Sequence, residues 1–497
     1  MSPSSLVLLL SLVSTWLLPS SFALPATTHH DSYDERLIFR PLADGKVSIL
    51  FNFHIKASNV TAHHSVTPPT LTLPLQRNGV SELHLSFVAG RWQHERWGQP
   101  IHSEVGGTGA EMRAWIRGSQ PEEKWTAVTN ALAGIFCSSL GQISPAITSS
   151  PSNIFTQNPA NQQEGSFLHV QLPSETLCTE NLTPFLKLVP CKGVSGISGL
   201  MKPYILLAHD WHAMGIDYTS NEDDSATDLL LWWEAVVDPI DWQKHTSRGN
   251  SSSGDGFRLW NYDSELSHKN IDFRWINESA FVPPLEIAAQ PISFSRILTG
   301  TGQLEGGLEA TIRNNQDIAR TVKYLEILPW WIQPWLHRLR VEEGGLPAEE
   351  CLVGKKYIPS IERTRPTTLE LTIAIQPKTT VRIHLPFNKA FIRYTEHPPD
   401  ASRGFDLPPA ILYLQDLADT LSEETSSQRP PAALWQRQKL RIYSSKLLLD
   451  LATPDFSMPY NVIIMTSTLL ALFFGSVFNA LTRRFGVVQV DPLQKKA

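Results

Sequence analysis

Apolar and polar residues alternate with a period of two over several short stretches of the chain, a pattern typical of strands that bury one face. The alternation predicts strands over residues 37–56, 83–88 and 167–172 in the first half, and over 324–328, 369–375, 380–385 and 391–394 in the second half. In the second half, turn residues separate the strands at intervals of about ten residues, a spacing typical of a β-sandwich.

A helical period occurs in fewer places. Residues 125–140 put one apolar face on a helix, which we expect to bury Cys137 near its end. The members of this face are Trp125, Val128, Leu132, Ile135, Phe136 and Leu140. Residues 228–242 predict a second helix. The fold class we expect is α+β and β-dominated, with a β-sandwich-like second half and one C-terminal transmembrane helix.

Both ends of the chain carry targeting signals. Residues 1–23 predict a secretory signal peptide, because an apolar run is followed by Ser21-Phe22-Ala23, with small residues at positions −3 and −1 of a cleavage site. The alternative is a membrane anchor that is retained. Residues 459–482 predict a spanning helix, since the stretch from Val462 to Val477 has no charge and about 20 residues cross a bilayer.

Arg483 and Arg484 follow this helix directly, and positively charged residues favour the cytosolic side. We therefore expect a single-pass type I protein with a cytosolic tail at residues 483–497. A removable C-terminal anchor signal is the rival interpretation, but such signals end in their apolar tail and this chain continues with polar residues. Between the two ends we expect an N-terminal α+β domain over 24–245 and a β-sandwich-like domain over 257–450, joined by a Ser/Gly/Asn-rich linker.

Composition narrows the class of protein. Charged residues make up 18% of the 497 residues, with 36 Pro and 28 Gly, which excludes a coiled coil and a wholly disordered chain. The net charge of −6 gives no reason to expect a nucleic-acid partner.

Catalytic and cofactor motifs are missing from the sequence. It contains no G-x-S-x-G, H-E-x-x-H or C-x-x-C motif and no phosphate-binding glycine loop, so we expect no cofactor. The glycines between residues 299 and 307 predict a tight turn between strands. His209 and His212 flank a short loop that favours a hydrogen-bonded turn over a metal site, because a third ligand is not indicated.

Four cysteines are too few for a disulfide scaffold and enough for one or two specific bridges. Three of them lie close together in the sequence, at Cys137, Cys178 and Cys191, and the fourth is Cys351. They either pair internally or leave one thiol to bridge another chain, and spacing alone leaves both open. Candidate N-glycosylation sequons begin at Asn59, Asn181, Asn250 and Asn277.

Motifs spread over most of the chain are similar to those of the PIG-T family, a subunit of the glycosylphosphatidylinositol (GPI) transamidase, and the chain resembles a fungal-type member. The strongest motif is Cys-Thr-Glu-Asn-Leu-Thr-Pro at residues 178–184, which runs on to Cys191. The other motifs lie at residues 82–98, 132–140, 298–307, 324–337, 396–405 and 453–462. Residues 64–69 depart from the family pattern, and residues 203–290 match it poorly, so nothing is carried over there.

The resemblance implies a non-catalytic scaffold subunit in the endoplasmic reticulum membrane, with most of the chain in the lumen. Catalysis would belong to a PIG-K-type cysteine-protease-like partner that is linked by a disulfide to Cys178. We would then pair Cys137 with Cys191. The resemblance further implies other membrane subunits of the transamidase as partners and a GPI lipid near the transmembrane helix.

Asn461 lies at the start of the predicted spanning helix. Polar groups in such helices usually face a partner helix or a polar ligand, so Asn461 is a candidate contact with other subunits or with the GPI headgroup region. Solvation at the membrane surface is an equally good explanation.

Two other functions compete with the scaffold. One is a stand-alone hydrolase or transamidase that uses its own cysteine. The other is a luminal glycan- or client-binding membrane receptor, in which Trp92, Trp97 and the tryptophans between 330 and 335 would stack on sugars.

Overall fold

The structure is a computed structural model of the whole chain. The residues that it describes are 31–57, 66–157, 165–201, 206–207, 209–221, 226–238, 258–261, 290–300, 302–397, 403–414, 440–453 and 457–486. The predicted signal peptide and the sequons at Asn59, Asn250 and Asn277 lie outside these residues.

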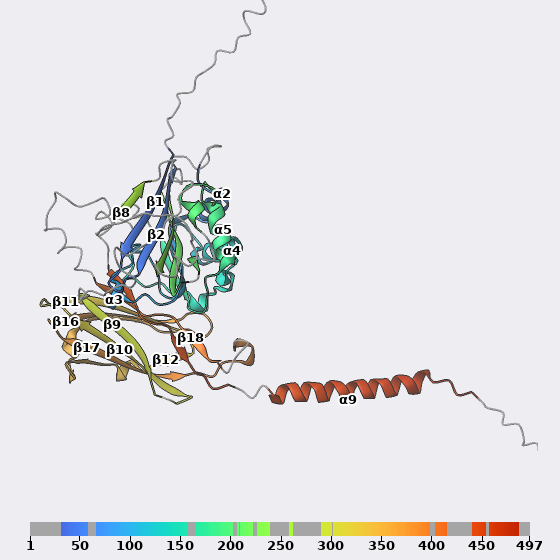
Figure 1. Cartoon of the computed structure of the whole chain (residues 1–497). Coiled ribbons are helices and arrows are strands. Elements are labelled where there is room, and N and C mark those ends of the chain that lie inside the picture. The colour runs from blue at the N-terminus through green and yellow to red at the C-terminus, as the bar shows by residue number, and fades with distance from the viewer. Residues whose placement is uncertain are drawn as a thin grey trace, which may run out of the picture.

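The first half of the chain forms an eight-stranded sheet in which every neighbouring pair is antiparallel (Figure 1). The strand order is β5-β4-β3-β6-β7-β2-β1-β8. The strands are β1 (Ser32–Pro41), β2 (Val47–Ala57), β3 (Val80–Ala89), β4 (Gly109–Ile116), β5 (Ser166–Leu172), β6 (Trp211–Ser220), β7 (Thr227–Val237) and β8 (Arg258–Asn261).

Helices cover one face of this sheet, at the right of Figure 1. They are α2 (Pro69–Arg77), α4 (Pro121–Phe136) and α5 (Thr179–Leu188), while the short α3 (His94–Trp97) lies in the loop between β3 and β4. The alternation along β3 explains the arrangement, since Leu83, Leu85 and Phe87 join the apolar core under the helices. The residues between them point to the opposite face of the sheet.

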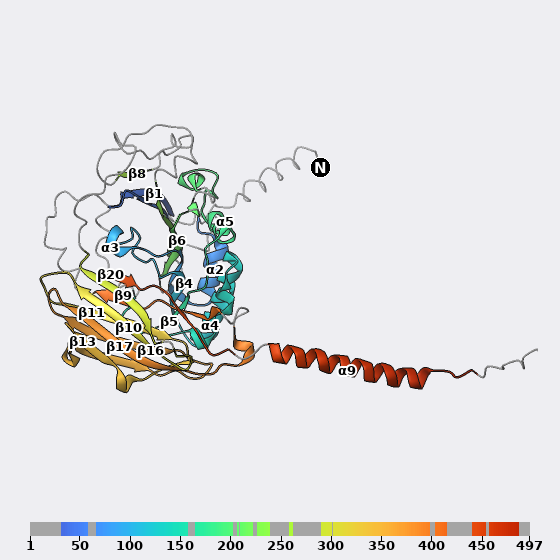
Figure 2. The same ribbon diagram turned by 60° about the horizontal axis from the view of Figure 1, so that its bottom comes forward.

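The second half of the chain forms two packed sheets, seen together at the lower left of Figure 2. One sheet has the order β14-β13-β17-β10-β9, with β12 also paired to β17, and the other has the order β15-β16-β11-β19-β20. The strands are β9 (Ile292–Thr299), β10 (Glu305–Asn314), β11 (Arg320–Leu328), β12 (Ile332–Pro334), β13 (Arg340–Glu343), β14 (Leu346–Pro347), β15 (Leu352–Ile358), β16 (Thr367–Ile375), β17 (Thr380–Lys389), β19 (Ile411–Leu414) and β20 (Leu440–Tyr443). A separate pair joins β18 (Phe405–Leu407) to β21 (Leu447–Leu449).

One core joins the two sheets of this second half. Ile312 from β10 and Ile383 from β17 share a cluster with Ile373 from β16 and Leu412 from β19. Side chains from both inner faces therefore interdigitate, which is the packing of a β-sandwich. The expected β-dominated fold with a sandwich-like second half is confirmed.

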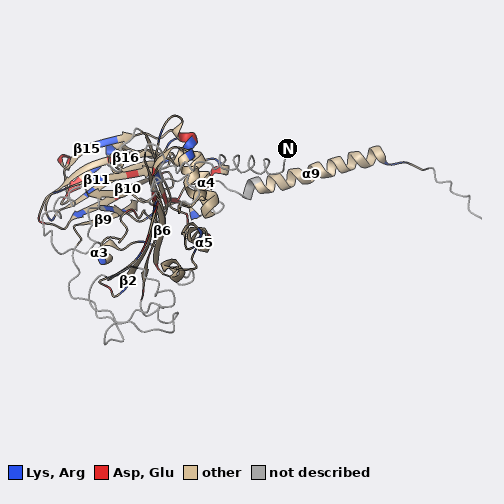
Figure 3. Ribbon diagram, turned by 90° about the horizontal axis from the view of Figure 1, so that it is seen from above, with Lys and Arg blue, Asp and Glu red and all other residues tan. Residues whose placement is uncertain are grey.

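The last described helix, α9 (Ser457–Thr482), leaves the folded body as a separate rod (Figure 1). It carries no Lys, Arg, Asp or Glu, and Figure 3 draws it without a charged residue along its length. Its segment Tyr460–Thr482 is long and apolar enough to cross a membrane, and none of it is buried against the rest of the chain. The expected C-terminal membrane helix is therefore present.

The predicted helix over residues 228–242 is wrong, because β7 (Thr227–Val237) occupies the described part of this segment up to Val237. Leu229, Leu231 and Trp233 lie in the core under the helices, and Leu230 and Trp232 pack on the other side. A strand that is buried on both faces is apolar throughout, and its pattern alone does not distinguish it from a buried helix.

Other expectations need smaller corrections. The helix expected over 125–140 is α4, which begins at Pro121 and ends at Phe136, because Cys137 adopts a left-handed conformation with φ 50°. This turn leaves Cys137 exposed and not buried as we expected. Residues 391–394 form no strand, and Phe391 is 73% exposed. β8 pairs with β1, so the predicted start of the second domain at 257 is too early.

Candidate functional site

The face of the eight-stranded sheet opposite the helices carries charged side chains that are buried or largely buried. They lie on neighbouring strands, because β3, β4 and β6 are adjacent in the sheet. The group consists of Glu82, His84, Glu111, Arg113 and Asp217. Buried charges are tolerated only where they are paired, so their contacts determine what this face does.

His84 lies between two carboxylates. Its Nδ1 is 2.7 Å from Asp217 Oδ1, and its Nε2 is 2.8 Å from Glu82 Oε1. Burial and the nearby Arg113 by themselves would lower the pKa of His84, but the hydrogen bonds and charges of the two carboxylates outweigh them and raise it to about 9. His84 is therefore a cation at neutral pH and holds β3 to β6. The other oxygen of Asp217 is 2.9 Å from Nε2 of His102, in the loop that leads to β4.

A second group of charges joins the two halves of the chain. Arg441 Nη1, on β20 of the sandwich, lies 2.6 Å from Glu104 Oε2 in the loop before β4. Arg113 of β4 pairs with the same carboxylate. Burial by itself would raise the pKa of Glu104, but the two guanidinium groups outweigh it and hold the pKa well below its usual range. Both guanidinium groups also lie over the Phe155 ring, at 5.2 and 5.3 Å from its centre.

Further contacts extend this junction between the two halves. The backbone N–H groups of Ser152 and Asn153 donate to the two oxygens of Glu370 on β16, at 3.0 and 2.8 Å. An apolar cluster beside them joins the halves through Trp115, Ile154, Phe155, Leu325, Ile327, Ile411 and Tyr413. The junction therefore combines apolar packing with charge-assisted hydrogen bonds, which fix distance and orientation together.

Gly107 is required for this close approach. A Cβ at this position would meet Pro409 Cγ at 2.8 Å and Tyr443 Cδ1 at 3.0 Å, both from the sandwich half. Any side chain at 107 would push the two halves apart, so the sequence keeps the junction tight at this point.

Cys178 lies on the helical face of the first half, at the position preceding α5. Its N–H donates to Asn181 Oδ1 at 2.9 Å, and its thiol reaches the same oxygen at 3.2 Å. The amide nitrogen of Asn181 donates in turn to the carbonyl of Phe136 at 2.7 Å. These bonds fix the start of α5 against the end of α4 and leave the cysteine partly exposed.

The structure does not form the expected bridge between Cys137 and Cys191, since all four cysteines are free. The two residues belong to different surroundings. Cys137 ends α4 beside Asn181, whereas Cys191 lies beside Glu35 and Tyr33 of β1, where burial first and then the Glu35 carboxylate raise the pKa of its thiol. Cys351 is buried beside Glu343 in the sandwich half.

A sequence profile described as "Gpi16 subunit, GPI transamidase component" matches residues 16–252 and 241–497 of the chain. The chain belongs to the Gpi16 family. A Schizosaccharomyces pombe protein named GPI transamidase component PIG-T homolog is 30% identical, over 94% of this chain and 92% of its own length. Two similar relatives are the Saccharomyces cerevisiae GPI transamidase component GPI16, at 26% identity over 92% of this chain and 89% of its own length, and the human GPI-anchor transamidase component PIGT, at 27% over 92% and 91%.

Gpi16-family membership confirms the resemblance drawn from the motifs, and the structure places these motifs on different elements. Residues 82–87 lie in β3, residues 132–136 in α4, residues 179–184 in α5 and residues 324–328 in β11. The family motif that begins at Cys178 thus surrounds the contact between α4 and α5.

The sequon at Asn181 fits poorly with its place in this Gpi16-family fold. The side chain is 1% exposed, and its amide nitrogen is engaged by Phe136. A glycan on this nitrogen would require the hydrogen bond to break and the side chain to leave the core.

Two further expectations from the sequence concern loops. His212 Nδ1 lies 3.1 Å from the carbonyl oxygen of His209, as in a hydrogen-bonded turn, and no cluster of three potential metal ligands occurs among the described residues. Gly300 has φ 82° between β9 and β10, which agrees with the expected tight turn.

Sequence reasoning missed the charged junction of this Gpi16-family member. A signal was present in β3, where Glu82, His84 and Ser86 occupy every second position, as on a solvent-facing side. His84 pairs with Asp217, 133 positions away, and the Glu104 carboxylate that Arg113 contacts is shared with Arg441, 337 positions from Glu104. Nothing local in the sequence therefore indicated that this face is covered.

Proposed function

We propose that this chain is the non-catalytic scaffold subunit of a GPI transamidase in the endoplasmic reticulum membrane, with its two folded halves in the lumen. Its partners would be a PIG-K-type catalytic subunit, attached by a disulfide to Cys178, and other membrane subunits. Family membership and the position of Cys178 carry this proposal. The thiol is partly exposed at the start of α5. The hydrogen bond from the Cys178 N–H to Asn181 fixes the orientation of this residue.

The rigid junction supports the same role. A scaffold must hold a bound catalytic subunit at a constant position relative to the membrane helix. Glu104 with Arg441, and Glu370 with the backbone at 152–153, fix the two halves of the chain to each other. A disulfide at Cys178 would add a covalent link to a body that is already rigid.

The glycan-binding alternative has less support. Trp92 and Trp97 are buried, and their indole N–H groups donate to Gly98 O and Asp44 Oδ2, both at 2.7 Å. These rings anchor a loop and do not present a flat face for a sugar to stack on.

Non-reducing electrophoresis tests the covalent link. The native complex is expected to contain a mixed-disulfide species that disappears with reductant and in Cys178→Ser. Cys137→Ser and Cys191→Ser are matched controls from the same region, and both should keep the species. Persistence of the species in Cys178→Ser, or its loss only in a control variant, would contradict the assignment.

The membrane helix is the second contact that we propose. At 100° per residue, Asn461, Thr468, Gly475, Asn479 and Thr482 fall along one side of α9. Small and polar residues on one side of a spanning helix favour contact with a partner helix. This side would face the other membrane subunits or the GPI headgroup region.

Asn461→Leu is the direct test of this helix face, and Thr466→Leu, on the opposite side of α9, is its control. The first change should reduce co-purification of the other subunits or attachment of GPI anchors, and the second should not. Equal assembly and equal attachment for both variants would remove the proposal.

A further inference from the structure

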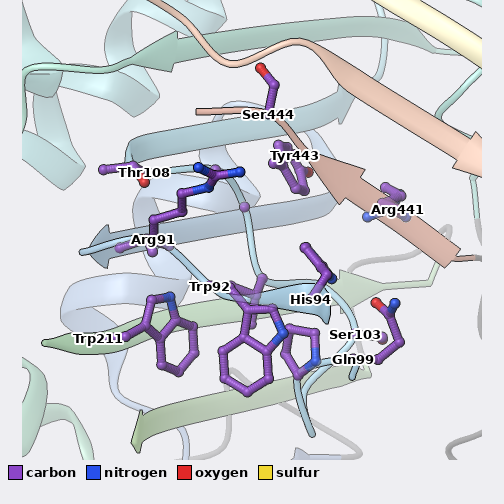
Figure 4. Close-up of a pocket in the computed structure, with 15 residues that line it drawn as sticks. Arg91, Trp92, His94, Gln99, Ser103, Thr108, Trp211, Arg441, Tyr443 and Ser444 are labelled. Carbon is purple, nitrogen blue, oxygen red and sulfur yellow. The ribbon is translucent and has the colours of Figure 1, made fainter. Parts of the chain in front are cut away.

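A cleft opens where the two halves of the chain meet. Its volume is about 660 Å³, including its open mouth. It is lined by residues of β3 and of the loop between β3 and β4, by Trp211 at the start of β6, and by residues from the segment 441–444 of the sandwich half (Figure 4). The cleft therefore exists only when the two halves are docked.

Unpaired hydrogen-bond donors face this cleft. Arg91 is exposed and has no ion-pair partner among the described residues. The indole of Trp211 is completely buried, yet its N–H has no hydrogen-bond partner in the described part of the chain. Nε of Arg441 is also without a partner there, although the same guanidinium pairs with Glu104. A buried donor left unpaired destabilises the fold, so a ligand that accepts a hydrogen bond from it would be favoured.

The charge of the cleft is positive. Its lining includes Arg91 and Arg441 and, in the described part of the chain, no Asp or Glu. Glu104, which pairs with Arg441, is shared with Arg113. His94 adds no charge at neutral pH, because burial, and then the neighbouring Arg91, lower its pKa to about 4. The charge of Arg91 thus remains uncompensated.

The walls of the cleft are aromatic. The rings of Trp92 and Trp211 meet edge to face with centres 4.5 Å apart, and Tyr443 lies across from them in Figure 4. Gly106 and Gly107 contribute backbone without side chains, which keeps the space between the rings open. Aromatic walls lower the local polarity and so strengthen a charged contact beside them.

We propose that this cleft is a binding site for a small anionic group, a carboxylate or a phosphate monoester, that accepts hydrogen bonds from Arg91 and from the indole of Trp211. Either group supplies several acceptor atoms and one negative charge or more, which matches an unpaired guanidinium beside unpaired N–H donors. Because Tyr443 and Arg441 come from the sandwich half, the bound anion would also stabilise the docked arrangement of the two halves.

Isothermal titration calorimetry tests the site with the full-length chain, purified in detergent with its co-purifying subunits. The probes are N-acetylglycine for a carboxylate and inorganic phosphate for a phosphate monoester, each at matched ionic strength. Arg91→Gln removes the cation, and Arg96→Gln is the control, since Arg96 is an exposed arginine of the same loop that does not line the cleft. Arg91→Lys keeps the charge and should retain part of the binding.

At least one probe should saturate the native chain and Arg96→Gln, and Arg91→Gln should bind it at least about tenfold more weakly. Binding of N-acetylglycine alone assigns the site to peptide carboxylates, and binding of phosphate alone assigns it to phosphate monoesters. Equal binding by Arg91→Gln and Arg96→Gln, or no saturation by either probe in the tens of millimolar, overturns the proposal. Both variants should melt at the temperature of the native chain, because both side chains are exposed.

Discussion

The two faces of the eight-stranded sheet are covered in different ways. The face under α2, α4 and α5 is apolar, with side chains such as Phe87 and Trp233 packed against the helices. The opposite face carries His84, Arg113 and Asp217, and it meets the Trp-rich loop and the sandwich half. Apolar packing stabilises without fixing direction, whereas paired charges need one geometry. We infer that apolar packing under the helices stabilises the first half of the chain. The paired charges on the opposite face determine the orientation in which the second half docks.

The largest effect is expected from the apolar face. Trp233→Ala removes a side chain that is fully buried under the helices, and such truncations cost about 3–5 kcal/mol. Chemical denaturation should show the first half of the chain unfolding at a lower denaturant concentration. A loss below about 1 kcal/mol would mean that this core is looser than its burial indicates.

At the junction between the two halves we expect a smaller loss of stability than for Trp233→Ala. We also expect the two halves to separate more readily. Arg441→Ala leaves Glu104 with Arg113 as its remaining partner, so we expect a cost of about 2 kcal/mol. Limited proteolysis and small-angle scattering should show the two halves moving independently while each stays folded. Arg403→Ala is the matched control, because this arginine is largely exposed and pairs only within its own half. An unchanged scattering profile for Arg441→Ala would contradict the role given to the charged face.

The smallest effect concerns pH. The pKa of His84 is raised in the folded chain to about 9, so its contribution to stability is complete below the unfolded value of about 6.5 and declines as pH rises toward 9. Asp217 has a lowered pKa, so its contribution is lost as pH falls through the acidic range. Between pH 7 and 8 the native chain should lose about 1 kcal/mol through His84. His84→Gln should flatten this dependence, and an unchanged slope in that variant would show that other groups are responsible.

The alternation of apolar and polar residues predicts those strands that bury one face and leave the other polar. β3, β5 and β11 alternate clearly, and each was expected close to where it lies. β7 is buried on both faces, so its apolar pattern predicts a helix as readily as a strand. The motif at Cys178 indicates the family, but the contact of Asn181 with Phe136 depends on packing between two helices. The cleft at Arg91 and Tyr443 joins residues 352 positions apart, which no local signal indicates.

Mass spectrometry of the native complex tests the central claim most directly. The complex would be alkylated before purification and digested without reductant, so that disulfide-linked peptides can be identified. The account predicts that the peptide containing Cys178 is joined to a cysteine peptide from another polypeptide. Recovery of Cys178 only in alkylated form, or joined to Cys137 or Cys191 of its own chain, would contradict it.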